Sequence, residues 1–382
     1  MNMKFVACNI YVTAAASSHA PTLLSLLRSA QDQCREIRAQ DDDDDSYNTG
    51  TVNALSGNKA MAHVAVIHAY ADKPYDRSSF HLAGRPDRVS EVASRLIRKA
   101  LEEIELDCTT SADGVESRHP FVGLVDHVSV MPINIQDQSG VIGSECEAAA
   151  NAAREIGRQM AETNLVRVHY YGMACPNKTS LASVRKEKTS FFKSGGAIDK
   201  ARITEDTYTF TSKGDATVGA PVNFVENFNI RLTPNVKLEQ AKTLTQFLRG
   251  RNICSRGFGV AGVEALTLPY VRDKLKGSKV FEVACNLTSP KEGSADDVQV
   301  QLQKWAERQR QEPPERGAIE EDASKRYYEY FVEDAYRVGT TEEQCISVLL
   351  NNKEDNVGVC KNDMIWEKYD NDVYSKFQEL LH

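Results

Sequence analysis

The chain of 382 residues is long enough for two or three structural units. With 41% hydrophobic and 26% charged residues, it has the composition of a folded globular protein. Its net charge of −8 argues against a general nucleic-acid-binding surface, which needs a positive field to displace counterions from phosphates. No stretch approaches the ~18 apolar residues of a membrane span. We therefore expect neither a nucleic acid nor a membrane among its partners.

The nine cysteines are scattered and form no C-x-x-C pair, and the sequence contains no H-E-x-x-H motif. Such a set is typical of reduced thiols, so we expect a cytoplasmic protein without a metal site. Residues 5–16 resemble a signal peptide, but Asn9, Tyr11 and Thr13 interrupt the apolar run. The β-branched and aromatic alternation of this segment favours a first strand instead.

The first half of the chain alternates between strand and helix patterns. A helix is predicted from residue 21 to about residue 33. A mobile acidic insertion follows over residues 36–60, because its five aspartates at positions 41–45 cannot bury apolar surface. Strands are predicted over residues 63–70, 78–83, 121–133 and 165–171, and helices over residues 84–104 and 146–160. This alternation indicates an α/β or α+β fold.

The second half of the chain predicts a smaller α/β unit after a long polar connection over residues 186–216. Strands are predicted over residues 223–232, 260–268 and 279–287, and helices over residues 238–248 and 298–310. We therefore expect an N-terminal subdomain over residues 1–200, a C-terminal subdomain over residues 216–311, and a C-terminal extension over residues 312–382.

Residues 257–262 spell G-x-G-x-x-G, and Glu282 follows 20 residues later, where a ribose-binding acid would lie. A dinucleotide fingerprint follows a strand and opens a helix. This one follows a predicted helix and enters a predicted strand. The pattern therefore favours a flexible connecting loop over a nicotinamide or flavin site.

His119 stands in Ser117-Arg118-His119-Pro120, immediately before a predicted strand. A histidine beside an arginine and a stiffening proline is suited to proton transfer near neutral pH, although a structural role remains the alternative. Asp126 and His127 lie farther along the same strand and are expected to point to opposite faces. At most one of them would then accompany His119.

Six segments carry motifs in a fixed order along the chain. They are Ala83-Gly84-Arg85-Pro86-Asp87 preceded by Arg77, residues 119–126 (HPFVGLVD), residues 166–172 (VRVHYYG), residues 216–219 and 227–230 (ATVG and NFNI), and residues 281–287 (FEVACNL). Together they resemble the formiminotransferase domain of glutamate formiminotransferase–cyclodeaminase, and especially its shorter relatives that end after that domain. In that family the motif corresponding to residues 119–126 reads H-P-R-M-G-A-L-D, and the one corresponding to residues 166–172 reads V-P-V-Y-L-Y-G. The motifs corresponding to residues 216–219 and 227–230 read A-T-V-x-G and A-F-N-I.

The resemblance implies two α/β subdomains, each a mixed β-sheet with helices on its outer face, whose sheets face each other across a ligand groove. That groove would hold tetrahydrofolate, the carrier in one-carbon metabolism. The implied reaction moves a formimidoyl or formyl group between folate N5 and the amino group of glutamate. His119 would be the general acid and base, and Asp126 would orient its ring or stabilise the cationic amidine.

The resemblance also implies a set of residues that contact folate or substrate. These are Arg77, Tyr171, Gly172, Arg185, Thr209, Ser212, Lys213, Gly214, Asp215, Thr217, Gly219 and Asn229. Three of them, Arg77, Arg185 and Lys213, are candidates for the substrate carboxylates, with solvated surface charge as the alternative for each. The expected partners are small molecules, namely folate and glutamate or formimidoyl-glutamate, and the oligomeric state stays open, with a homodimer among the options.

The chain departs from the family pattern at several places. The family's H-P-R-M is His119-Pro120-Phe121-Val122 here, its W-G before A-T-V is Gly214-Asp215, and its early P-N-F-S-E-G is replaced by residues 10–15 (IYVTAA). These changes leave a second hypothesis, a non-catalytic folate-binding protein on the same fold. Because no long helical domain follows the last motif, we do not expect the chain to deaminate formimidoyl-folate.

Overall fold

In a computed structural model of the protein, the described residues are 4–15, 17–43, 63–106, 120–134, 142–189, 191, 212–271, 279–309, 328–350 and 371–381. They form two compact units. The first comprises Met1–Asn223 and Thr340–His382, and the second comprises Phe224–Gly339. His119, Thr209 and most of the acidic insertion lie outside the described residues.

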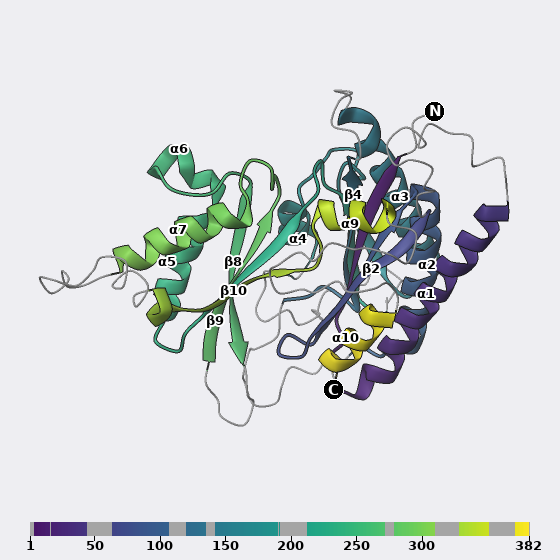
Figure 1. Ribbon diagram of the computed structural model, residues 1–382, viewed down its shortest axis with the longest axis horizontal. Coiled ribbons are helices and arrows are strands. Elements are labelled where there is room, and N and C mark those ends of the chain that lie inside the picture. Colours follow the sequence, from purple (N-terminus) through teal and green to yellow (C-terminus); the bar gives the residue numbers. More distant parts are fainter. Residues whose placement is uncertain are drawn as a thin grey trace, which may run out of the picture. The chain divides into compact units, whose positions relative to one another are not determined.

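The first unit contains a six-stranded sheet and its helices (Figure 1). Its elements are β1 (Phe5–Val12), η1 (Ser17–His19), α1 (Ala20–Asp43), β2 (Val64–Asp72), β3 (Arg77–Gly84), α2 (Pro86–Glu103), β4 (Val125–Ile133), α3 (Ile142–Glu162), β5 (Arg167–Gly172), α4 (Leu181–Lys188), β6 (Asp215–Ala220), α9 (Glu342–Leu350) and α10 (Asn371–Leu381). The strand order is β2-β3-β1-β4-β6-β5. The sheet is mixed, because β2, β3, β1 and β4 pair antiparallel, whereas β4, β6 and β5 pair parallel.

The two faces of this sheet differ because side chains alternate along a strand. Along β1, Val6, Cys8, Ile10 and Val12 are fully buried in the hydrophobic core, to which α1, α2 and α3 contribute their apolar faces. The intervening residues of β1, which are Phe5 and Ala7 followed by the polar Asn9 and Tyr11, point to the opposite face. The helical side of the sheet therefore supplies the core, and the other side remains for a site.

Helix α1 is longer than predicted. It was expected to end near residue 33, but it continues to Asp43. Cys34 and Ile37 are buried and extend the apolar stripe of the helix at spacings of three and four residues. The polar composition after residue 36 predicted a loop instead of a helix. Ile37 is the apolar residue that packs this part of the helix against the core.

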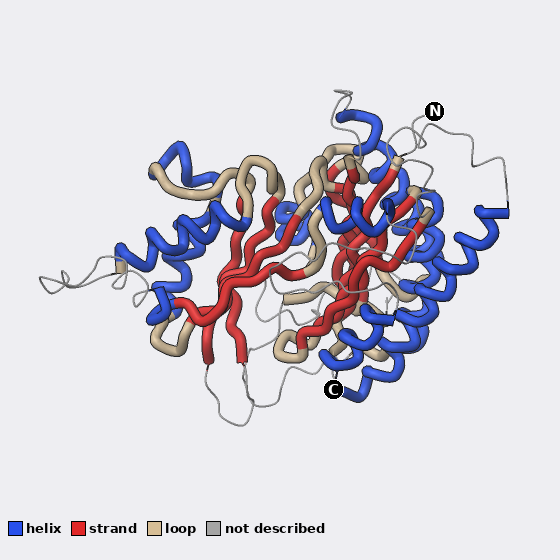
Figure 2. The backbone as a smooth tube through the Cα atoms, viewed as in Figure 1, coloured by secondary structure: helices blue, strands red, loops and turns tan. Residues whose placement is uncertain are grey.

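The second unit is built on an antiparallel sheet. Its elements are β7 (Glu226–Leu232), α5 (Leu238–Leu248), η6 (Gly250–Asn252), α6 (Ile253–Arg256), β8 (Val263–Val271), β9 (Lys279–Leu287), α7 (Ala295–Arg308) and β10 (Val332–Val338). The strand order is β10-β7-β9-β8, and every pairing is antiparallel. Helices α5 and α7 cover one face of this sheet (Figure 2). Trp305 of α7 is buried in the core of this unit.

The predicted α/β class with two sheet-bearing units is confirmed. The loop over residues 257–262 connects α6 to β8, so the G-x-G-x-x-G pattern does not open a helix. Residues beyond 311 contribute to both units, since β10 joins the second sheet while α9 and α10 belong to the first unit. Among the described residues, no helix is both long and apolar enough to span a lipid bilayer.

Helix α10 packs into the core of the first unit, and this contact generates a prediction. Phe377 is fully buried and meets Phe80 of β3 edge-to-face, with ring centroids 5.4 Å apart. Phe377→Ala removes this ring from a packed site, so the free energy of unfolding should fall by about 3–5 kcal/mol in urea denaturation. Leu380→Ala, at an exposed position of the same helix, is the control. A loss below about 1 kcal/mol for Phe377→Ala would contradict the docking of α10.

Candidate functional site

One face of the first sheet carries an almost continuous row of polar and aromatic side chains, which we call the polar face. Its members come from all six strands: Asn9 and Tyr11 of β1, His68 of β2, Ser79 and His81 of β3, His127 and Ser129 of β4, His169 and Tyr171 of β5, and Thr217 of β6. Strand register brings them together. Tyr11 lies opposite both Ser79 and His127, and Thr217 lies opposite both His127 and His169.

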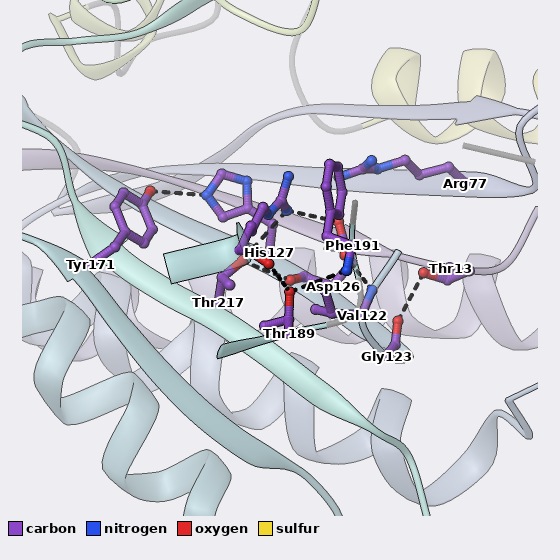
Figure 3. Close-up of polar contacts among 11 residues, drawn as sticks. Thr13, Arg77, Val122, Gly123, Asp126, His127, Tyr171, Thr189, Phe191 and Thr217 are labelled. Carbon is purple, nitrogen blue, oxygen red and sulfur yellow. Dashed lines mark hydrogen bonds and ion pairs between the residues drawn. The ribbon is translucent and has the colours of Figure 1, made fainter. Parts of the chain in front are cut away.

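The carboxylate of Asp126 forms the centre of this face. It is 1% exposed, and its Oδ2 accepts hydrogen bonds from Arg77 Nη2 at 2.9 Å and Arg185 Nη2 at 3.1 Å. Its Oδ1 accepts a third bond, from the backbone N–H of Val122 at 2.9 Å (Figure 3). A buried carboxylate is tolerated only when it is paired and hydrogen-bonded, and these three donors meet that need. They also hold β3, β4 and α4 in one fixed arrangement.

The expectation that Asp126 and His127 point to opposite faces is wrong. The register shifts between Tyr11, which pairs with His127, and Val12, which pairs with Val125, so that Asp126 is an extra residue in a β-bulge. Arg77, which binds Asp126, lies 4.6 Å over the ring of Tyr11, and this ring stacks on His127 with centroids 5.5 Å apart. The bulge therefore brings Asp126 and His127 into a single cluster.

Arg185 reaches this cluster from α4, which begins at the N-cap Ser180. Its guanidinium lies over Phe191, 4.1 Å from the ring centroid, and Nη2 is 3.4 Å from Thr217 Oγ1. Burial lowers the pKa of Arg185, while Asp126 opposes this shift and the like charge of Arg77 adds to it. Among the described residues, its buried Nε has no hydrogen-bond partner. Arg185 is thus a buried cation whose carboxylate partner among the described residues, Asp126, also pairs with Arg77.

A hydrogen-bonded chain of side chains lies beside Arg185. His127 Nε2 is 2.9 Å from the hydroxyl of Tyr171, which donates to Ser129 Oγ at 3.1 Å. Burial raises the pKa of Tyr171, so the phenol stays protonated. The ring of Tyr171 rests on Gly219, where a Cβ would lie only 2.4 Å from Tyr171 Cδ1. The predicted residues Tyr171 and Gly219 therefore meet on the polar face.

The other predicted site residues have different surroundings. Lys213 is buried and donates to the carbonyl of Ile104 at 2.7 Å and to Glu105 at 2.9 Å, which attaches it to the end of α2. Gly214 forms an isolated bridge with Gly123, and Ser212 is exposed in the adjoining turn.

Gly172 ends β5 with a φ of 59°, where a Cβ would lie 2.2 Å from the carbonyl oxygen of Ala220. Asp215 pairs with Arg167 and His169. Asn229 belongs to the second unit, where it donates to Glu282 at 2.8 Å.

Sequence reasoning missed several members of the polar face, including Tyr11, Ser129 and His81. The signal was the appearance of polar residues at every second position of otherwise apolar strands, such as Asn9 and Tyr11 in β1. No cluster of three His, Cys, Asp or Glu side chains that could hold a metal ion is found among the described residues.

Comparisons with known proteins point to one family. Residues 45–221 match the formiminotransferase domain, N-terminal subdomain, and this range includes Arg77, Asp126, Arg185 and Thr217. The chain is 24% identical over 258 residues to a protein of Arabidopsis thaliana named formiminotransferase cyclodeaminase-like protein, which covers 63% of this chain and 77% of that protein.

Two solved structures of proteases are only distantly similar. The periplasmic protease PqqL from Escherichia coli is 10% identical with a TM-score of 0.17, and pitrilysin is 11% identical with a TM-score of 0.20. The alignments cover 100% of this chain but only 40% and 41% of the two proteases, so the chain spans about two fifths of their length.

The buried pairing of Asp126 predicts that a small change of this side chain has a large effect on the free energy of unfolding. Asp126→Asn keeps the size of the side chain but removes the charge that pairs with two arginines, which should lower the free energy of unfolding by about 3–5 kcal/mol. Glu147→Gln, which loses an exposed ion pair with Arg154, should cost below about 0.5 kcal/mol. Urea denaturation of both variants measures the difference, and equal small losses would show that Asp126 does not hold the cluster together.

Proposed function

We propose that the protein is a folate-dependent one-carbon transferase, because its residues 45–221 match the formiminotransferase domain, N-terminal subdomain. The transferred group would be formimidoyl or formyl, and it would move between N5 of tetrahydrofolate and the amino group of glutamate. The polar face of the first sheet would be the surface on which this chemistry takes place. A cytoplasmic location is part of this proposal.

The observation that carries the proposal is the buried guanidinium of Arg185. A buried cation that shares one carboxylate with a second arginine is stabilised by an additional anion. Glutamate, formimidoyl-glutamate and the glutamyl tail of folate all carry carboxylates. Arg185, supported by Arg77, would therefore hold a substrate carboxylate in a bidentate contact.

Aromatic groups on the same face suit a flat ligand. Tyr11 and His127 stack with their ring planes 10° apart, and His127 Nε2 lies within hydrogen-bond distance of the Tyr171 hydroxyl. A pterin is a planar ring with hydrogen-bond donors and acceptors on its edge, so it can lie along stacked rings while polar groups bind its edge. Thr217, Gly219 and the turn before β6 would complete this contact.

His119 would move the protons in this reaction. The ammonium of glutamate must lose a proton before it attacks the amidine carbon, and N5 must gain one as it leaves. An imidazole near its usual pKa can serve both steps. His119 lies outside the described residues, so its role follows from the family motif alone, and Asp126 would stabilise the cationic amidine.

A non-catalytic folate-binding protein on the same fold is the second candidate. It is favoured by the departures from the family pattern at Phe121 and Val122 and in β1. Saturable binding of tetrahydrofolate without turnover of formimidoyl-glutamate would support it, whereas turnover supports the transferase.

The role of Arg185 is tested by a pair of substitutions. The wild-type chain should transfer the formimidoyl group of formimidoyl-glutamate to tetrahydrofolate, which is followed by folate absorbance. Arg185→Met should raise the KM for formimidoyl-glutamate by about 100-fold, which is the effect of losing a charge-assisted pair of about 2.7 kcal/mol. Arg185→Lys keeps the charge but loses the planar fork, and it should recover only part of the loss. An unchanged KM in Arg185→Met would remove this residue from the binding site.

The assignment of His119 has its own test. His119→Gln keeps hydrogen bonding but cannot titrate, so turnover should fall by about 10²–10⁴-fold. The Kd for tetrahydrofolate, measured by titration, should change by less than about tenfold, or 1.4 kcal/mol. The wild-type rate should also fall on acidification, because the base becomes protonated. Near-normal turnover in His119→Gln would return this residue to a structural role.

A further inference from the structure

Three departures from the family pattern meet at one point of the polar face. The motif V-P-V-Y-L-Y-G has arginine at 167 and histidine at 169 in this chain, where the pattern has proline and tyrosine. The W-G before A-T-V has aspartate at 215 in place of glycine. Arg167 and Asp215 are register partners in β5 and β6, and His169 follows on the same face of β5.

The three side chains form one ionic cluster. Asp215 Oδ1 accepts a hydrogen bond from Arg167 Nε at 2.8 Å, and Asp215 Oδ2 lies 3.5 Å from His169 Nε2. Within the described part of the chain, His169 Nε2 is buried and makes no hydrogen bond, so it lies close to the carboxylate without being hydrogen-bonded to it. Burial by itself raises the pKa of Asp215, but the contacts with His169 and Arg167 outweigh it and lower the pKa below its usual value. Asp215 thus stays ionised beside the imidazole.

This cluster adjoins the proposed binding residues. His169 lies opposite Thr217, whose Oγ1 donates to the backbone carbonyl of Asp126 at 3.0 Å and lies 3.4 Å from Arg185 Nη2. Tyr171 follows on the same face of the same strand. The side chain of His169 is 13% exposed, whereas that of Asp126 is 1% exposed, so His169 is the more accessible of the two.

We propose that His169, positioned by Asp215, is a second proton-transfer residue of the polar face, a role specific to chains that carry this histidine–aspartate pair. The inference rests on the proposed function. Because Nε2 faces the carboxylate, Nδ1 is the ring nitrogen left to exchange a proton with substrate. Asp215 would orient the ring, as a carboxylate does for a catalytic histidine.

The step balances without a further reactant. Neutral His169 takes a proton from the ammonium of the acceptor amino acid, and the free amine forms a bond to the amidine carbon. The bond between that carbon and folate N5 then breaks, and N5 keeps the electron pair and takes a proton from protonated His119, the general acid of the proposed function. His169 ends protonated and His119 neutral, each returns to its starting state by exchanging one proton with solvent, and Asp215 carries a negative charge throughout.

The charged and titratable groups around His169 are few among the described residues. Asp215 faces it from β6, Arg167 and Tyr171 lie on its own strand, and α4 brings Arg185 against the same part of the sheet. Strand β5 is the edge of the sheet as described. A merely structural cluster would stabilise this edge, whereas a proton-transfer residue would change the pH dependence of the rate.

The test compares substitutions of both partners with the wild-type chain. His169→Tyr restores the residue of the family pattern, and His169→Gln keeps the polarity. In both, kcat for formimidoyl transfer should fall at least 100-fold, with KM values for tetrahydrofolate and formimidoyl-glutamate changed by less than fivefold. Asp215→Asn should lower kcat by about tenfold, because the ring loses the carboxylate that orients it. Glu155→Gln, which loses an ion pair with Arg158 on the outer helix α3, should leave kcat unchanged.

A second readout does not depend on turnover. In His169→Gln, the pKa of the Asp215 carboxyl, followed by carbon NMR, should rise because a contact that lowers it is lost. Wild-type turnover together with a kcat within threefold of wild type in His169→Tyr would overturn this inference alone. A wild-type chain that binds tetrahydrofolate but transfers nothing would overturn the proposed function and this inference together. An unchanged pKa of Asp215 would show that the pair is not formed.

Discussion

The carboxylate of Asp126 has to be neutralised in a place without solvent, and this need constrains much of the first unit. Arg77 must come from β3, Arg185 from α4, and the N–H of Val122 from the chain that enters β4. These donors can reach the carboxylate only because the bulge in β4 turns Asp126 toward the polar face. Because removal of one partner leaves a buried charge uncompensated, a substitution of any one partner alone should destabilise the fold.

The C-terminal segment adds a second constraint to the same sheet. Thr340 Oγ1 lies 3.4 Å from His81 Nδ1, and Glu342 accepts a hydrogen bond from the backbone N–H of Asn134 at 2.8 Å. These contacts cover the histidine pair His68 and His81, and burial lowers the pKa of His68 to about 3, so both rings stay neutral. The rings of His68 and His81, on β2 and β3, are therefore buried and uncharged.

Periodic patterns predicted most of the fold, because they report which residues are buried. Helix α2 follows from Val89, Val92 and Leu96 at helical spacing. Pairing between distant segments leaves no such local trace. The pairing of β10 with β7 joins residues about a hundred positions apart, and the bulge at Asp126 appears only when β1 and β4 are in register. The sequence offered Arg77, Asp126 and Arg185 as candidate site residues, but their shared contact appears only in the three-dimensional arrangement.

Asp126 and Asp215, the two aspartates of the polar face, differ in their partners and in their exposure. Asp126 is 1% exposed and its partners are two arginines and a backbone N–H, none of which loses a proton near neutral pH. Its charge balance is therefore constant, which suits a group that fixes binding residues. Asp215 has one arginine and one histidine as partners, and its side chain is 14% exposed. Asp215 thus differs from Asp126 in having a histidine among its described partners, and the proposed proton-transfer role of His169 rests on this difference.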